Sequence, residues 1–225
     1  MHSRLLKISI LSSIVVAATA AQAGVMAISG PTNLITDPNQ MKYKADAYQT
    51  NTYNYWMEQQ GHTLANNLVV SILPPGGYPV NSTTHSGNGS LTIAAGTMVD
   101  SHYFYYDPTG STSAVARFKF DAPILGIISN ETAGAASDHF LMSDFLMNPA
   151  VPVANQAVTH FTARGLEIGA NDDFIRWIAA DEIELHFTAA SPGDQIRVLT
   201  AVPEPMTMTV LGLGGLLVAR RRRRK

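Results

Sequence analysis

Residues 24–200 consist of short segments rich in Val, Ile, Tyr and Phe, separated by clusters of Gly, Pro, Asn and Asp. Segments of this length and composition are typical of β-strands, and the residues between them are typical of turns. The pattern predicts an all-β fold, and we expect a single antiparallel β-sandwich of the jelly-roll type. The expected strands are residues 25–29, 53–59, 67–73, 89–94, 97–106, 114–120, 124–129, 165–168, 182–188 and 195–200.

Helical signals are sparse in the same region. Short helical turns are expected at residues 137–147 and 172–179, whereas residues 48–60 fit either a helix or a strand. These segments are too short to change the predicted fold class.

Several of the intervening loops have recognisable turn chemistry. The Asp-Pro-Thr-Gly sequence at residues 107–110 has the signature of a type I turn. The Ser-Pro-Gly-Asp sequence at residues 191–194 is expected to join the last two strands as a hairpin. Residues 81–90 are rich in Ser, Thr, Asn and Gly, and we expect them to form a surface loop.

The region between residues 24 and 200 is expected to be one domain. It spans 177 residues, enough to bury a substantial core without disulfide bonds, and no repeat or linker divides it. The chain contains no Cys. Thiol catalysis, Cys-ligated zinc sites and iron–sulfur clusters are therefore excluded.

The same region is acidic. It contains 7 Lys and Arg residues against 16 Asp and Glu residues, which leaves a formal charge of −9 with His neutral. Binding to nucleic acid requires clustered cations that neutralise phosphates, so nucleic acid is not an expected partner.

Residues 1–23 have the organisation of a secretory signal peptide. Two cations, Arg4 and Lys7, precede an apolar stretch at residues 8–20, which would form the signal helix. Small residues then lead to Ala23, and we expect signal peptidase to cleave between Ala23 and Gly24. The protein is therefore expected to be exported.

The last residues of the chain combine a short apolar segment with a cluster of cations. Residues 206–219 are uncharged, and as a helix they would be about 21 Å long against a bilayer core of roughly 30 Å. We expect a short transmembrane helix that spans the inner membrane with little length to spare. The cations that follow are Arg220, Arg221, Arg222, Arg223, Arg224 and Lys225. Such a cluster stays on the cytoplasmic side, so the acidic domain would lie on the periplasmic side.

Residues 202–225 resemble the PEP-CTERM sorting signal of Gram-negative bacteria that produce exopolysaccharide. The resemblance rests on Pro203, Glu204 and Pro205, followed by a short Gly- and Leu-rich apolar segment and a terminal Arg cluster. It implies recognition of Pro203, Glu204 and Pro205 by an exosortase, a membrane peptidase that processes such proteins for the cell surface or extracellular matrix. The inner membrane would then hold only the precursor.

Two features of residues 24–200 suggest a ligand. The strand expected at residues 97–106 alternates Tyr103 and Tyr105 with His102, Phe104 and Tyr106, which fits either a packed core or a platform for stacking sugars. We expect no cofactor and no metal, because no complete calcium-binding loop is present; the adjacent carboxylates Asp172 and Asp173 are the candidate ligands for the alternative, a calcium ion.

No catalytic signature occurs in the chain. Asp138, His139, Ser143 and Asp144 lie close in sequence, but a polar loop and helix cap explains them better than a catalytic triad. We therefore expect a non-enzymatic domain that binds exopolysaccharide or other matrix proteins. The alternative is a secreted polysaccharide-active enzyme, because paired carboxylates are recognised only from their separation in space.

Overall fold

A computed structural model describes residues 24–44, 47–77, 80–83, 91–129, 139–156, 165–166, 173–190 and 193–202. The strands are β1 (Val25–Ser29), β2 (Thr32–Leu34), β3 (Thr50–Thr63), β4 (Leu68–Val70), β5 (Val80–Thr83), β6 (Leu91–Ile93), β7 (Met98–Asp107), β8 (Thr112–Phe120), β9 (Ile124–Ile128), β10 (Phe174–Ala179), β11 (Glu182–Ala189) and β12 (Asp194–Ala201). The helical segments are η1 (Pro38–Gln40), α1 (His139–Ser143), η2 (Asp144–Leu146) and α2 (Val153–Gln156). The described residues are therefore mostly β, as the sequence predicts.

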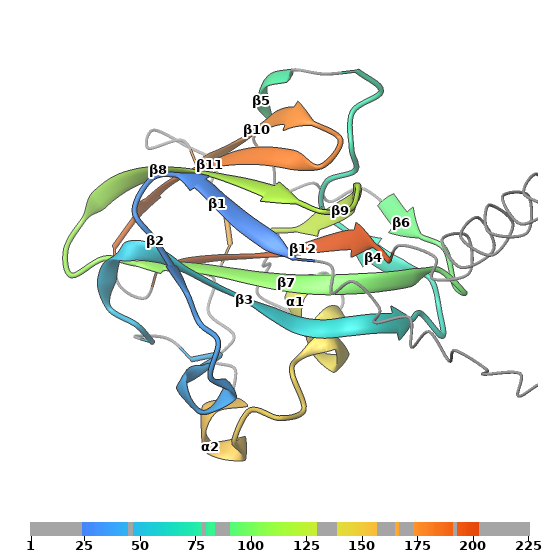
Figure 1. Cartoon of the computed structure of the whole chain (residues 1–225), viewed down its shortest axis with the longest axis horizontal. Helices are drawn as coiled ribbons and strands as arrows, with labels where there is room; N and C mark the ends of the chain where they lie inside the picture. The colour runs from blue at the N-terminus through green and yellow to red at the C-terminus, as the bar shows by residue number, and fades with distance from the viewer. Residues whose placement is uncertain are drawn as a thin grey trace, which may run out of the picture. The chain divides into compact units, whose positions relative to one another are not determined.

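The strands form two five-stranded sheets and a small two-stranded sheet. The first sheet has the order β1-β8-β11-β10-β5, and the second has the order β2-β3-β7-β12-β9. Strands β4 and β6 form the third sheet. All described strand pairs are antiparallel except β2 and β3, which run parallel. Figure 1 shows the two larger sheets as stacked layers.

The two larger sheets share one hydrophobic core. Phe118 on β8 and Trp177 on β10 contribute from the first sheet, and Tyr53 on β3 and Phe104 on β7 contribute from the second. Successive side chains of a strand point to opposite faces, so alternate residues of β7, β8, β10, β11 and β12 enter this core. Phe104 and Phe118 lie 4.8 Å apart between ring centroids, in an edge-to-face arrangement. The shared core holds the two sheets face to face.

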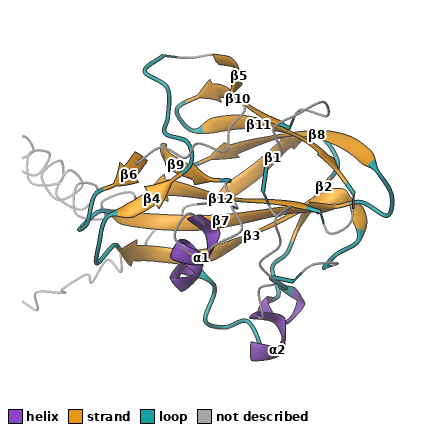
Figure 2. Ribbon diagram, turned by 180° about the vertical axis from the view of Figure 1, so that it is seen from behind, coloured by secondary structure: helices purple, strands orange, loops and turns teal. Residues whose placement is uncertain are grey.

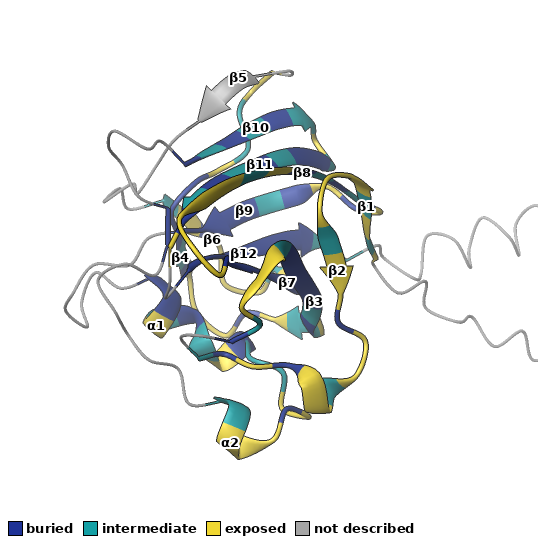
Figure 3. Ribbon diagram, turned by 90° about the vertical axis from the view of Figure 1, so that its left-hand side faces the viewer, coloured by how far each residue is buried: buried dark blue, intermediate teal, exposed yellow. Residues whose placement is uncertain are grey.

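A second core covers the opposite face of the second sheet. Trp56 and Tyr103 project from β3 and β7, and their rings stack with centroids 5.0 Å apart. Segments outside the sheet supply the cover, including Tyr43, Phe140 on α1 and Leu146 on η2. Figure 2 shows α1 and α2 on this side of β3 and β7. In Figure 3 strand β12 is largely buried, whereas the residues of β2 and α2 are exposed or half-buried.

Most of the expected strands are present, with shifted ends, but three expectations are wrong. Residues 174–179 form strand β10 rather than a helix, and it pairs with β11 along its length. Residues 165–166 are not in a strand, and residues 167–168 lie outside the described residues. The expected loop at residues 81–90 begins within strand β5. Residues 48–60, left open between helix and strand, lie mainly in β3.

The expected hairpin at residues 191–194 is also wrong. Strand β11 belongs to the first sheet and β12 to the second, so this connection crosses between layers. Gly193 in this connection has a φ of +76°. A Cβ atom added there would lie 2.6 Å from the Tyr106 carbonyl oxygen. The turn chemistry correctly marks a chain reversal but does not specify which sheet receives the next strand.

The expected terminal segments lie outside the described residues. They are the signal helix within residues 1–23 and the transmembrane helix within residues 206–219. Among the residues that the structure does describe, no helix has the length and apolar character needed to cross a membrane.

Candidate binding groove

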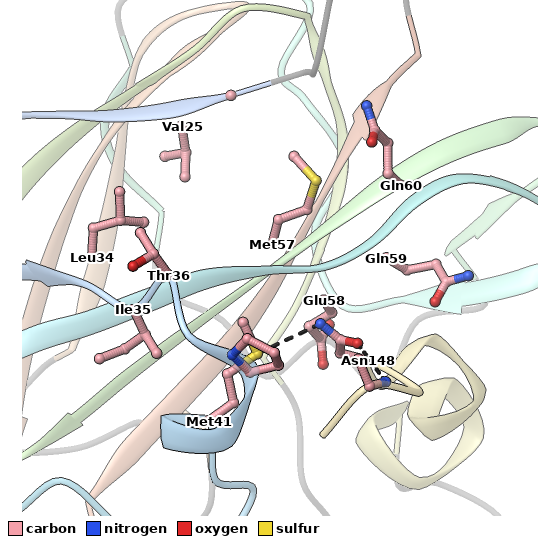
Figure 4. A pocket seen from close by; sticks show the side chains of 13 residues that line it. Val25, Leu34, Ile35, Thr36, Met41, Met57, Glu58, Gln59, Gln60 and Asn148 are labelled. Atoms are coloured by element: carbon pink, nitrogen blue, oxygen red, sulfur yellow. Dashed lines mark hydrogen bonds between the residues drawn. The ribbon is translucent and has the colours of Figure 1, made fainter. Parts of the chain in front are cut away.

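A groove of about 490 Å³ runs along one edge of the second sheet. Apolar side chains and amides line it, together with one ionisable side chain, that of Glu58. The lining residues are Gly24, Val25, Leu34, Ile35, Thr36, Pro38, Met41, Met57, Glu58, Gln59, Gln60, Asn148 and Ala150. Figure 4 shows Met57 on the same side of β3 as Val25, with Glu58 and Asn148 on the other side. The groove therefore wraps around the edge of β3.

The groove exists because β2 is much shorter than β3. Strand β2 pairs with β3 only from Tyr53 to Tyr55, and the Ile35 amide then donates to the Tyr55 carbonyl at 2.9 Å. Beyond Tyr55, no described strand pairs with β3 on the side away from β7. As far as the described residues go, the second half of β3 therefore presents an open strand edge, which is a surface that can pair with an extended chain.

The chain leaves the edge of β3 because of its local sequence. Pro38 cannot donate a backbone hydrogen bond to a sheet, and it begins η1 instead. The Asp37 side chain caps this turn by accepting a hydrogen bond from the Asn39 amide at 2.9 Å. The segment then returns to the sheet at Met41, whose sulfur accepts from the Asn148 side chain at 3.6 Å. This detour forms one wall of the groove.

Glu58 is held by an ion pair under the groove. The Arg197 guanidinium on β12 donates from Nε to Glu58 Oε2 at 2.5 Å and from NH2 to Glu58 Oε1 at 2.8 Å. The Ser101 hydroxyl donates to Glu58 Oε2 at 2.6 Å. All three residues are buried. Such a charge-assisted, bidentate arrangement fixes the position of both charged groups.

Arg197 also connects the sheet to the helical cover. Its NH1 donates to the Ser143 hydroxyl at the end of α1, and its NH2 lies 3.6 Å from Asp144 Oδ1 on η2. The guanidinium carbon lies 5.5 Å from the centre of the Tyr103 ring. Burial lowers the pKa of Arg197, but the Glu58 charge and hydrogen bonds more than compensate, so the net pKa is raised. The cation therefore stays charged inside the fold.

The described residues near α1 that the sequence places close together, His139 and Ser143, bond to different partners. The Ser143 hydroxyl donates to the backbone carbonyls of His139 and Phe140 at 2.8 and 2.9 Å. The His139 ring bonds instead to the Ser71 hydroxyl, with Nδ1 and Oγ 3.0 Å apart. Asp138 lies outside the described residues. Ser143 therefore acts in packing and in the Arg197 network.

The aromatic strand β7 belongs to the core, and the alternative of an exposed sugar-stacking platform is wrong. Phe104 and Tyr106 enter the core between the sheets, whereas Tyr103 and Tyr105 enter the core under the helical cover. All four side chains are at most 1% exposed. The predicted alternation of faces is correct, but neither face is available to a ligand.

The candidate calcium ligands are only partly described. Asp173 is buried, and its Oδ1 accepts a hydrogen bond from the Thr188 amide at 2.6 Å. Asp172 lies outside the described residues. Within the described ranges, no three His, Asp or Glu side chains gather closely enough to hold a metal ion. The absence of a cofactor stays a prediction, and calcium at Asp172 and Asp173 stays its untested alternative.

The predicted processing sites lie at the limits of the described chain. Gly24 is the first described residue and lies just before β1, whereas Ala23 lies outside the described residues. The expected recognition residues Pro203, Glu204 and Pro205 and the cations Arg220, Arg221, Arg222, Arg223 and Arg224 also lie outside them.

Sequence reasoning missed the Glu58 and Arg197 pair. A signal was present, because Arg197 is the only charged residue between Asp194 and Glu204 and stands between the apolar residues Ile196 and Val198. A lone cation in a buried strand requires a buried partner. The partner could not be identified, since it lies 139 residues away.

No family model, curated protein or solved structure matches this chain.

Proposed function

We propose that this protein is an exported component of the cell surface or extracellular matrix, delivered by an exosortase through residues 202–225. The observation that carries the proposal is the order of elements in that segment: Pro203, Glu204 and Pro205, then a short apolar stretch, then a terminal Arg cluster. The signal peptide at residues 1–23 supports the same route. The domain between them would be a single β-sandwich of the jelly-roll type that remains outside the cell.

The proposed role of the domain is binding rather than catalysis. Glu58, the only ionisable residue lining the groove, already engages Arg197 and Ser101. A general acid or base must reach the substrate and exchange a proton with it. A carboxylate held in a buried ion pair is poorly suited to that role, whereas a groove of apolar and amide side chains suits a ligand that stays intact.

An extended segment of another matrix protein is the ligand that fits the groove best. The open edge of β3 offers backbone hydrogen bonds to an added strand, and Leu34 and Met57 offer apolar contacts for its side chains. Polysaccharide is a weaker fit, because no aromatic side chain lines the groove for stacking against sugar rings.

Deletion of residues 202–225 tests the sorting proposal. The full-length chain should reach the cell surface with its C-terminus processed, whereas the deleted chain should be exported and released without that processing. A matched control replaces only Val202 with Ala and leaves the recognition residues intact. Surface delivery of the deleted chain at the normal level would contradict the proposal.

Incubation of the purified exported protein with the host exopolysaccharide tests the binding role. We expect no change in the length of the polymer. Turnover that is abolished by substitution of one Asp or Glu would establish the enzymatic alternative instead.

A further inference from the structure

Gly24, the first described residue, makes a direct hydrogen bond to a carboxylate. The Gly24 nitrogen donates to Asp121 Oδ2 at 2.6 Å, and the Asp121 amide donates back to the Gly24 carbonyl at 3.1 Å. Asp121 follows the end of β8, and β1 pairs with β8 from Val25 opposite Phe120. The contact therefore closes the end of the first sheet.

The Gly24 nitrogen is also the atom that the predicted cleavage would change. In the uncleaved chain it belongs to a neutral peptide bond and carries one hydrogen. Hydrolysis of the Ala23–Gly24 bond adds one water, so that Ala23 gains a carboxylate and Gly24 gains an amine. That amine takes up a proton from solvent below its pKa of about 7.7–8.0. Cleavage would thus place a positive charge at the nitrogen that faces Asp121.

Among the described residues, no cationic side chain forms an ion pair or hydrogen bond with Asp121. Asp100 on β7 is buried and interacts electrostatically with Asp121. Its Oδ1 accepts from the Gly61 amide at 2.6 Å, and its Oδ2 has no partner among the described residues. The nearest cation on β8, Lys119, pairs instead with Asp181 at 3.4 Å. A second carboxylate therefore lies within electrostatic reach of Asp121.

We propose that cleavage between Ala23 and Gly24 creates an N-terminal ammonium that forms an ion pair with Asp121 and fixes β1 to the edge of the first sheet. The inference rests on the proposed export of the protein, because signal peptidase supplies the cleavage. The precursor holds β1 by a neutral hydrogen bond, and the mature protein holds it by a charge-assisted one. Processing would therefore stabilise the edge strand that borders the groove at Val25.

The ion pair predicts a defined dependence on pH. An adjacent carboxylate favours the protonated amine, so the pKa of the Gly24 amine should lie above its ordinary value. The charged groups around it are Asp121 from the β8–β9 turn and Asp100 from β7, with Lys119 occupied by Asp181 and Glu58 of β3 occupied by Arg197. The stabilisation is complete below the ordinary pKa of the amine and is lost as the pH rises through its raised pKa.

The test uses the exported, processed protein labelled with 13C-glycine. Mass spectrometry first identifies the N-terminal residue, and the carbon shifts of Gly24 are then followed across pH 6 to 11 to obtain the pKa of the amine. The variant Asp121→Asn keeps the shape of the side chain and removes its charge. The control Asp181→Asn removes the same charge from a carboxylate that pairs with Lys119 instead.

We expect the Gly24 amine to titrate above about 8.0 in the wild type and in Asp181→Asn, and within about 7.7–8.0 in Asp121→Asn. A wild-type value within the ordinary range overturns the inference, even if Asp121→Asn does not fold. If the pKa of the Gly24 amine falls by the same amount in Asp121→Asn and in Asp181→Asn, the inference is also overturned. A mature chain that begins at another residue overturns both the inference and the cleavage site in the proposed function, whereas a Gly24 start with an ordinary pKa overturns the inference alone.

Discussion

Arg197 and Glu58 form a buried, bidentate ion pair although they lie 139 residues apart in the chain. The pair joins β3 to β12, the two strands on either side of β7, and it lies beneath the helical cover formed by α1 and η2. It therefore links the floor of the groove to the core.

Arg197→Met should strongly destabilise the protein. It leaves the Glu58 carboxylate buried without its cation, and breaking such a pair costs about 3–5 kcal/mol of unfolding free energy. The double variant Arg197→Met with Glu58→Met should recover most of this loss, because two apolar side chains replace two buried charges. Chemical denaturation measures the unfolding free energies of the single and the double variant.

The partly exposed pair of Arg176 and Glu184 provides the matched control. Arg176 NH1 and Glu184 Oε1 lie 2.9 Å apart, but the Arg176 side chain is 41% exposed. Arg176→Met should cost less than about 1 kcal/mol. A double variant at Arg197 and Glu58 that is no more stable than Arg197→Met alone would show that the ion pair is not the source of the effect.

Gly193→Ala should destabilise the connection between the sheets. The residue has a φ of +76°, and a Cβ atom would lie 2.6 Å from the Asp107 Cβ. Strain and overpacking together should cost about 2 kcal/mol or more. Gly76→Ala is the control, since a Cβ atom there meets nothing within 4 Å. Equal thermal midpoints for the two variants would contradict the observed geometry.

His102 should make the protein less stable in acid. Burial lowers its pKa to about 4, and its Nε2 lies 3.2 Å from the Thr200 hydroxyl. Between the ordinary pKa of about 6.5 and this lowered value, the unfolded chain binds a proton that the folded chain excludes. The unfolding free energy should therefore fall as the pH falls through that window.

The variant His102→Gln should show a smaller fall over the same window. Asp100 has a raised pKa because of its burial, so it also titrates in acid, and only the difference between wild type and variant isolates His102. His62→Gln, at a half-buried histidine on β3, is the control. A variant at His102 with the same acid sensitivity as the wild type would rule out this cause.

Leu34→Asp should weaken binding to matrix proteins. Leu34 lines the groove and is 49% exposed, so a charge there can reach solvent without unfolding the domain. Val115→Asp is the control, because Val115 is 44% exposed on β8 and does not line the groove. Retention of the purified variants on matrix from the host cells measures the difference. Equal retention of both would place the binding surface elsewhere.

Strand positions were largely predictable because they depend on local composition and on turns. Strand β10 was missed because the apolar residues of its sequence, Phe-Ile-Arg-Trp-Ile-Ala, do not alternate cleanly with polar ones. In the structure Ile175 and Trp177 enter the core, while Arg176 faces outward and pairs with Glu184 on β11. Pairing with a neighbouring strand, which the local sequence does not contain, determines this element.

The layer arrangement and the groove were not predictable from the sequence. The sequence of the connection that contains Gly193 predicts a tight hairpin turn, but the strands on either side of it, β11 and β12, belong to different sheets. The groove depends on how far β2 extends along β3. Pro38 begins η1, where the chain leaves the edge of β3, but the sequence alone does not show that β2 pairs with β3 before that point. The resemblance of residues 202–225 to a sorting signal concerns delivery and carries no information about the groove.

Mass spectrometry of the protein recovered from the surface of its native cells tests the central claim most directly, because it identifies both termini at once. The account predicts a chain that begins at Gly24 and has lost the apolar segment and the cations after Pro205. A chain recovered from the cell surface that still carries Met1 and Lys225 would contradict it.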